Sequence, residues 1–151
     1  MDWQGKTALV TGGSQGIGRI IALSLGRTGC RVVVNCANNI DKAESVAAEI
    51  RAAGGNASAW RCNVADEAMV KQMFQELAPV DILVNNARLD PWRRSAEMSE
   101  GDWWSQVMDV NLKGAFLCSL ELFQQARQRG WGRIINISSV RAFRPAEMNM
   151  I

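Results

Sequence analysis

The chain has 151 residues, of which 48% are hydrophobic and 21% charged, and its formal net charge is +2. This length and composition are typical of a single globular domain, which we place over residues 1–151. A net charge this small argues against a nucleic-acid partner, and no apolar run approaches the roughly 20 residues of a membrane span, so we expect neither nucleic acid nor membrane as a partner.

The first predicted elements are a strand, a glycine-rich turn and a helix. The apolar run 8–10 stops at Thr11, and an amphipathic segment follows the turn. This arrangement can hold the pyrophosphate of a dinucleotide: Gly12 lets the chain turn, Gly16 leaves room for phosphate oxygens, and Gly18 lets the helix pack closely. A plain strand-to-helix turn is the alternative. By the i, i+3, i+4, i+8 rule, the predicted core face of the helix consists of Ile17, Ile20, Ile21 and Leu25.

Strands alternate with helices along the rest of the chain. Further strands are predicted by apolar runs at 32–34, 57–62, 82–84 and 133–137. The alternation predicts an α/β fold, a Rossmann-like doubly wound parallel sheet with helices on both faces. Right-handed crossovers place the strands in the order 3-2-1-4-5, and the ligand then lies beyond the carboxyl ends of strands one and four.

The helices between these strands have start signals in the sequence. Asp41, followed by Glu44, is the predicted N-cap of the second helix, and Asp66 and Ser99 are the predicted caps of the next two. The helix 115–129 carries a broad apolar stripe. The stripe consists of Phe116, Leu120 and Phe123.

The cysteines bear on the compartment and on metal binding. Their positions are Cys30, Cys36, Cys62 and Cys118. Their spacing matches no metal site, and scattered thiols of this kind are typical of a reduced, cytoplasmic protein. The N-terminus enters the first strand without a signal peptide, so we expect a cytoplasmic location. The sequence contains no histidine and no tyrosine, which removes the most common general base.

Five ordered motifs resemble those of the short-chain dehydrogenase/reductase family. They are Thr11–Gly18, Asn85–Ala87, Asp109–Gly114, Gly132–Ile137 and Ser138–Ser139. The likeness runs from about Trp3 to the last residue, and the nearest type is 3-oxoacyl-[acyl-carrier-protein] reductase. The resemblance implies a homo-oligomeric oxidoreductase that moves hydride between a nicotinamide and a small carbonyl or secondary alcohol substrate, including an acyl-carrier-linked one.

The resemblance implies two catalytic residues in this chain. Ser139 hydrogen-bonds the substrate carbonyl in the family, with Ser138 as the alternative here, and Asn111 holds a water in a proton relay. From its spacing to Trp104 and Val107, Asn111 is expected on the buried face of its helix. A satisfied structural asparagine, or a helix-end cap before Gly114, is the alternative.

The cofactor-binding residues that the resemblance implies are Thr11, Gly12, Ser14, Gln15, Gly16, Ile17, Gly18, Asn35, Cys36, Asn63, Val64, Asn85 and Ala87. Asn85 also has a structural reading, because in the family it steadies the central sheet. The second strand is followed by no acid before Asp41, so a 2′-phosphate would meet no repulsion and we predict NADP over NAD. The arginine expected for NADP is missing both there and at Gln15.

Two substitutions depart from the family pattern. Arg88 stands where the asparagine-asparagine-alanine motif continues with glycine, and Asn63 replaces an aspartate that contacts the adenine. Arg88, Arg93 and Arg94, with Trp92, are candidates to dock an acidic substrate or carrier. A solvated basic loop is the alternative reading.

The catalytic Tyr and Lys of the family are not in this sequence, because from Ser139 the expected Tyr falls one position beyond Ile151. The domain is therefore cut after its fifth strand, either as part of a longer enzyme or by a real stop. The alternatives to an enzyme are a nucleotide-binding pseudoenzyme, an oligomer subunit and a non-functional truncation product. Because the strand 133–137 becomes a sheet edge and the helix 115–129 lacks its partner, we expect the chain to self-associate.

Overall fold

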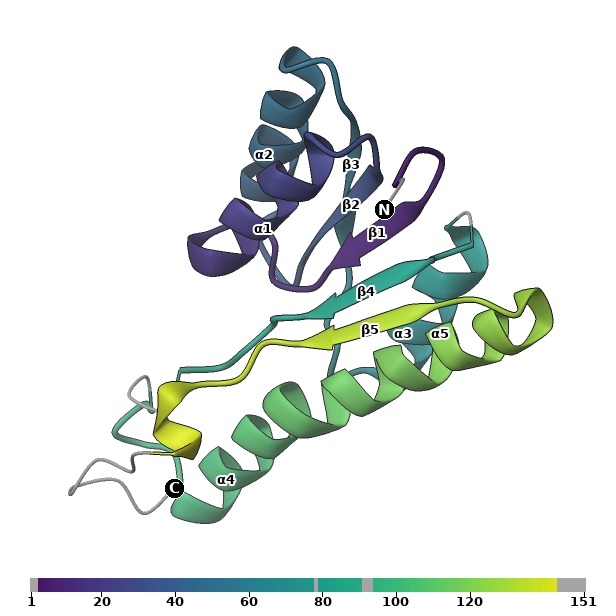
Figure 1. Ribbon diagram of the computed structural model, residues 1–151. Coiled ribbons are helices and arrows are strands. Elements are labelled where there is room, and N and C mark those ends of the chain that lie inside the picture. Colours follow the sequence, from purple (N-terminus) through teal and green to yellow (C-terminus); the bar gives the residue numbers. More distant parts are fainter. Residues whose placement is uncertain (1–2, 78, 91–93, 144–151) are drawn as a thin grey trace.

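The computed structural model describes residues 3–77, 79–90 and 94–143 (Figure 1). Its strands are β1 (Thr7–Val10), β2 (Arg31–Cys36), β3 (Asn56–Arg61), β4 (Ile82–Asn85) and β5 (Arg133–Asn136). Its helices are α1 (Gly16–Gly26), α2 (Ile40–Ala52), α3 (Glu67–Glu76), α4 (Glu100–Met108) and α5 (Gly114–Arg129). A π-helical turn (Asp109–Lys113) joins α4 to α5, and a short 3₁₀ turn (Val140–Ala142) follows β5.

The strands form one parallel sheet in the order β3-β2-β1-β4-β5, which confirms the predicted order. The two halves of the sheet meet where β1 pairs with β4, Ala8 lying beside Ile82 and Val10 beside Val84. All carboxyl ends therefore lie at one edge, and the winding reverses between β1 and β4. This is the edge at which the sequence places the ligand.

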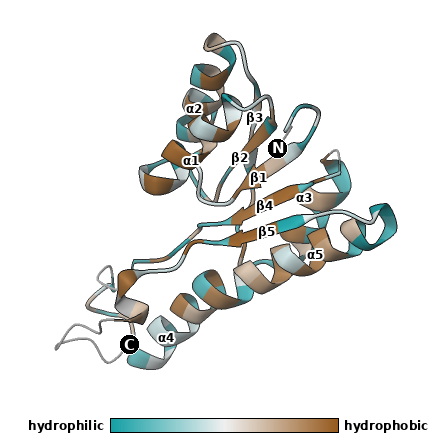
Figure 2. Cartoon of the chain, in the orientation of Figure 1, coloured by the Kyte–Doolittle hydropathy of each residue, from teal (hydrophilic) through white to brown (hydrophobic). Residues whose placement is uncertain are grey.

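Helices cover both faces of the sheet, and each face has its own core (Figures 1 and 2). On one face α1 and α2 pack on alternate residues of β1, β2 and β4, including Val10, Val34 and Val84. On the other face α3 and α5 pack on the intervening residues, including Leu9 and Leu83. The central strands are buried on both sides, which explains why they are continuous apolar runs rather than alternating ones.

The buried face of α1 differs from the prediction. Ile17 and Ile20 are 63% and 61% exposed, whereas the buried residues of this helix are Gly18, Ala22 and Gly26. Ile21 and Leu25 are partly buried against the core. The reason is close packing, because a Cβ at Gly26 would lie 2.5 Å from Cγ2 of Ile50 in α2. A helix this close needs small residues where it makes contact, and a periodicity of large apolar residues does not report them.

The helix caps match the predictions at two of three positions. The side chains of Asp66 and Ser99 accept the backbone N–H of Met69 and Asp102, as a capping residue does. The predicted cap Asp41 is wrong. Asn39 caps α2 by accepting the N–H of Lys42 at 3.0 Å, so the helix starts earlier than the Asp41 signal indicates.

The α4 and α5 helices bury a different stripe from the one predicted. Trp103 is buried in α4, while Trp104 is half exposed. In α5 the buried residues are Gly114, Leu117, Cys118 and Leu122. The predicted stripe faces outward instead, with Phe116 62% and Phe123 58% exposed. Beside this helix β5 pairs with β4 alone within the described residues, so an apolar helix face and an apolar edge strand are both exposed.

Nowhere in the described ranges is a helix both long enough and apolar enough to cross a membrane.

Candidate functional site

The carboxyl ends of β1 and β4 are joined by the hydroxyl of Thr11. It donates a hydrogen bond to the carbonyl oxygen of Val84 at 3.2 Å. It accepts the backbone N–H groups of Asn86 and Ala87 at 2.9 and 3.0 Å. Thr11 is buried, so one side chain bonds three backbone groups of the β4 end and fixes the start of the glycine-rich turn.

Asn86 clamps the same turn from the β4 side, and the sequence-based site list lacks it. Its amide donates to the carbonyl oxygens of Thr11 and Gly12 at 2.9 and 3.1 Å. A Cβ at Gly18 would lie 2.4 Å from both the Gly12 oxygen and the Asn86 Nδ2 atom. The signal that could have found Asn86 is a second asparagine directly after a buried strand, where an amide needs partners.

The glycine-rich turn approaches β4 closely and opens outward at the start of α1. Gly12 has φ +62°, and a Cβ there would lie 2.9 Å from the Cα of Ala87. Gly16 has φ +54°, and a Cβ there would meet nothing within 4 Å. Gln15 is the N-cap in extended conformation, makes no side-chain cap bond, and no acid lies in the first turn. The first N–H groups of α1 are therefore uncapped, and the positive end of the helix faces open space at Gly16. Such an arrangement can bind a pyrophosphate.

Asn35 supports the turn from β2 and is buried. Its Oδ1 accepts the N–H of Gly12 at 3.3 Å, and its Nδ2 donates to the carbonyl oxygen of Cys62 at 3.0 Å. Cys36 is also buried, and burial raises the pKa of its thiol. Both side chains therefore lie inside the protein, and Asn35 holds the turn in place.

Two further predicted residues follow β3. Asn63 is exposed, and its Oδ1 accepts the N–H of Ala65 at 3.1 Å in a local turn. Val64 is buried under the start of α5, where a Cβ at Gly114 would lie 2.7 Å from its Cγ2. Val64 is therefore a packing residue, while Asn63 lies at the ligand edge.

Asn85 ties β4 to its neighbours. Its Nδ2 donates to Oδ1 of Asn136 at 2.9 Å and to Oγ of Ser119 at 3.0 Å. Its own Oδ1 is buried and has no hydrogen-bond partner among the residues that the structure describes. These contacts link β4, β5 and α5 and support the structural reading of this residue.

Asn111 lies in the π-helical turn and is exposed, so its expected burial is wrong. Its Oδ1 accepts the N–H of Leu89 at 2.7 Å, and its Nδ2 donates to the Leu89 carbonyl oxygen at 3.2 Å. The amide is satisfied by loop backbone rather than by the core. One residue thus fixes the loop after β4 on the helix, and π-helical turns are frequent at functional sites.

Ser138 and Ser139 follow β5 at the same edge of the sheet, and both are exposed. The N–H of Ile137 still bonds the Asn85 carbonyl oxygen at 2.9 Å, which continues the ladder to this point. The carbonyl oxygen of Ser139 accepts the N–H of Ala142 at 3.0 Å and begins the 3₁₀ turn. The hydrogen bonds thus join Thr11, Asn86 and Asn35 in one cradle, with Asn111 and Ser139 on separate segments.

A family model described as short chain dehydrogenase matches residues 6–151. The chain belongs to the short-chain dehydrogenase family. It is 44% identical over 139 residues to a Staphylococcus aureus 3-oxoacyl-[acyl-carrier-protein] reductase FabG, covering 89% of this chain and 56% of the relative. The chain therefore spans little more than half the length of the relatives it matches.

Two solved structures of related proteins have similar folds. A metagenomic short-chain oxidoreductase in complex with NADP has a TM-score of 0.81 and 34% identity, covering 92% of this chain and 63% of that one. A gluconate 5-dehydrogenase from Burkholderia cenocepacia in complex with NADP and tartrate has a TM-score of 0.77 and 34% identity, covering 92% of this chain and 55% of that one.

The arginine that follows Ala87 is exposed and pairs with a carboxylate of its own loop. Arg88 is 68% exposed at its side chain and forms an ion pair with Asp90 at 3.0 Å. Arg94 pairs with Glu100. The other two residues of the predicted basic loop, Trp92 and Arg93, lie outside the described residues. Each described arginine of the loop thus has a neighbouring carboxylate that offsets its charge.

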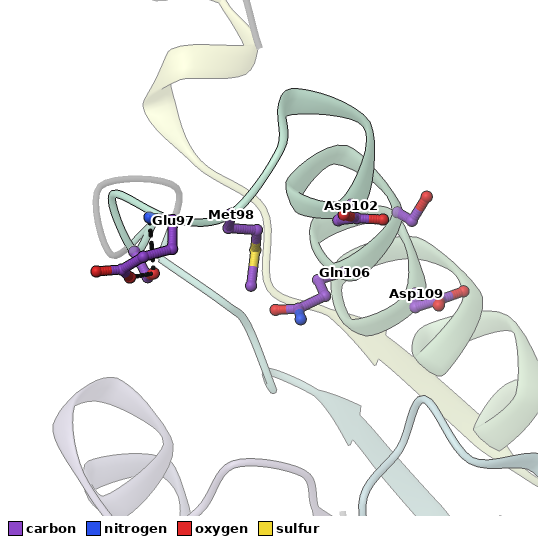
Figure 3. A pocket seen from close by; sticks show the side chains of 7 residues that line it. Glu97, Met98, Asp102, Gln106 and Asp109 are labelled. Carbon is purple, nitrogen blue, oxygen red and sulfur yellow. Dashed lines mark hydrogen bonds between the residues drawn. The ribbon is translucent and has the colours of Figure 1, made fainter.

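A separate cavity of about 560 Å³ lies between this loop and α4 (Figure 3). Its lining includes Glu97 and Met98 from the loop, Asp102 and Gln106 from α4, and Asp109 from the start of the π-helical turn. No residue of the glycine-rich turn lines it. Its three carboxylates make this cavity unfavourable for an anionic ligand.

Proposed function

We propose that the protein is an NAD(P)-dependent oxidoreductase that interconverts a carbonyl and a secondary alcohol. The observation that supports this most strongly is the clamped turn, in which Thr11, Asn35 and Asn86 hold a glycine-rich loop in front of the uncapped start of α1. That cradle matches the pyrophosphate of a nicotinamide dinucleotide in shape and charge. The bound dinucleotide would supply or accept the hydride.

The residues of this chain then have distinct tasks. The N–H groups of Gly16, Ile17 and Gly18 would bind the pyrophosphate, with Ser14 and Gln15 beside them. Asn63 would border the adenine, and Ala87 the nicotinamide half. Ser139 would donate a hydrogen bond to the substrate oxygen and so polarise the carbonyl. Asn111 would border the proton relay, and its two bonds to Leu89 would keep the loop after β4 in place.

We propose NADP as the cofactor. The end of β2 is followed by no acid until Asp41, which already lies in the first turn of α2. The ribose therefore meets no carboxylate of the kind that NAD sites use to bind its 2′-hydroxyl. The two solved relatives named above were both crystallised with NADP, which supports the same choice.

The proposed substrate is a small carbonyl compound, including one carried as an acyl thioester on a carrier protein. The name of the Staphylococcus relative supports this class. Arg88 and Arg94 are placed on a loop beside the site, and an acidic carrier would compete with Asp90 and Glu100 for them. The protein would work as a homo-oligomer, because Trp104, Leu112 and Phe116 line an exposed apolar face along α4, the π-helical turn and α5.

The test is nucleotide binding followed by turnover with the protein made from its native gene, after its intact mass has been measured. NADPH fluorescence should rise on binding, and a 3-oxoacyl thioester should then cause NADPH oxidation. Binding without oxidation would favour the nucleotide-binding pseudoenzyme. Absence of binding to both NADPH and NADH, in a protein that unfolds cooperatively, would refute the proposal.

A further inference from the structure

The place where a 2′-phosphate would lie is bordered by β3 as well as β2. Arg61 is the last residue of β3, and in the parallel ladder it stands opposite Cys36, the last residue of β2. Neighbouring strands are about 4.8 Å apart. The backbone of Arg61 is therefore beside the point at which β2 leaves the sheet, where the ribose of a dinucleotide is held in this kind of fold.

The Arg61 side chain projects on the same face of the sheet as α1 and α2. Side chains alternate along a strand, so residues 57, 59 and 61 share one face. Ala57 belongs to the core under α1 and α2, and Ala59 packs against it. Cys36 lies in the same core. Burial raises the pKa of the Cys36 thiol, and the positive charge of Arg61 opposes that rise, which agrees with a guanidinium close to the end of β2.

Within the described residues Arg61 has no counterion, unlike five other arginines of the protein. Arg19, Arg51, Arg88, Arg94 and Arg129 each pair with a carboxylate. Arg61 is exposed and forms no ion pair or side-chain hydrogen bond with any residue that the structure describes. Residues 37–39, which follow β2, are exposed and uncharged. An unpaired cation thus borders the open segment in which an anion would meet no repulsion.

We propose that Arg61 binds the 2′-phosphate of NADP and sets the preference of the protein for NADPH over NADH. This inference rests on the proposed function and names the residue that reads the cofactor. A guanidinium can donate two parallel hydrogen bonds to a phosphate, whereas the ammonium group of a lysine acts as a single point charge. An arginine that binds this phosphate was expected at position 15 or after β2, and neither place has one. It comes from the neighbouring strand, which only the sheet order places there.

The test is a pair of binding constants, for NADPH and for NADH, measured by nucleotide fluorescence. Arg61→Gln should weaken NADPH about ten-fold, the size of one charge-assisted hydrogen bond. NADH should change less than about two-fold, because it lacks the 2′-phosphate. Arg27→Gln is the matched control: Arg27 is also exposed, forms no ion pair within the described chain and lies at the far end of α1. It should leave both constants unchanged.

A second probe isolates the phosphate from the rest of the cofactor. Adenosine 2′,5′-bisphosphate should displace NADPH from the parent protein better than ADP does, and Arg61→Gln should abolish this advantage. Arg61→Lys should restore part of it. Equal loss of NADPH and NADH binding, or no loss of either, would overturn the role of Arg61 while leaving the proposed function intact. A parent protein that binds neither nucleotide would instead overturn the proposed function, and the role of Arg61 with it.

Discussion

Replacing Gly18 with alanine should destabilise the protein, because the new methyl group has no room. A Cβ at this position would lie 2.4 Å from the Gly12 carbonyl oxygen and 2.4 Å from Nδ2 of Asn86. These two atoms are hydrogen-bonded to each other at 3.1 Å. Overpacking costs about 1–3 kcal/mol, and the lost hydrogen bond costs about 1 kcal/mol more. The gain in helix propensity offsets about 1 kcal/mol at most, which leaves a net loss of about 1–3 kcal/mol.

Urea unfolding followed by tryptophan fluorescence measures this change, since the chain has 6 tryptophans. Gly101→Ala is the matched control. Gly101 lies in α4, and a Cβ there would meet nothing within 4 Å. This variant should gain about 0.4–1 kcal/mol. If Gly18→Ala were as stable as Gly101→Ala, the close approach of α1 to the Asn86 clamp would be refuted.

Three further predictions concern the other end of the sheet, the buried thiols and the exposed helix. Asp81→Asn should cost about 1–3 kcal/mol in urea unfolding, because it removes the charge that bonds Arg129 at 2.7 Å at a largely buried site. Burial raises the pKa of the Cys62 thiol to about 11 and that of Cys118 to about 12, from an ordinary value of 9.0. The unfolded chain loses these protons first, so stability should be level below about pH 9 and fall as the pH rises from there toward 12, as urea midpoints at increasing pH would show. Phe116→Glu should lower the mass observed in sedimentation at micromolar concentration, because it places a charge on the exposed face of α5.

Each of these predictions has a contradicting result, and the first two also have a comparison variant. Glu67→Gln breaks the exposed pair with Lys71 and should not change stability measurably, so an equal loss in it and in Asp81→Asn would contradict the first. Cys118→Ala should reduce the alkaline fall, and an unchanged fall would contradict the second. A sharp monomer peak for the parent chain would contradict the third.

The sheet order was predictable because strand-helix alternation and crossover handedness leave few topologies. The caps Asp66 and Ser99 were predictable because their side chains act locally. The start of α2 was not, since Asn39 and Asp41 are both acceptable caps and only tertiary packing selects between them. The buried face of α1 was not predictable for another reason. Its buried residues are Gly18, Ala22 and Gly26, which are too small to appear as a periodicity of large apolar side chains.

The candidate site was predictable in part for similar reasons. The turn was predictable because glycine is the residue that adopts positive φ readily, as Gly12 and Gly16 do here. Asn111 was expected to be buried, but its partner is the backbone of Leu89, and no pattern in the sequence indicates a contact with a main chain 22 residues away. Asn86 could have been found as a second asparagine directly after a buried strand. The place of Arg61 opposite Cys36 follows from the pairing register of β2 and β3, which the sequence pattern does not give.

The bond between Thr11 and Asn86 also has a consequence for the order of folding. The two residues are 75 positions apart, and the β1–β4 pairing spans a similar distance. The parallel β1–α1–β2 unit needs a much shorter connection and can form early. We therefore expect the glycine-rich turn to remain loose on a nascent chain until β4 has emerged from the ribosome and docked. A nucleotide at the proposed site would then bind only nascent chains in which the two halves of the sheet have met.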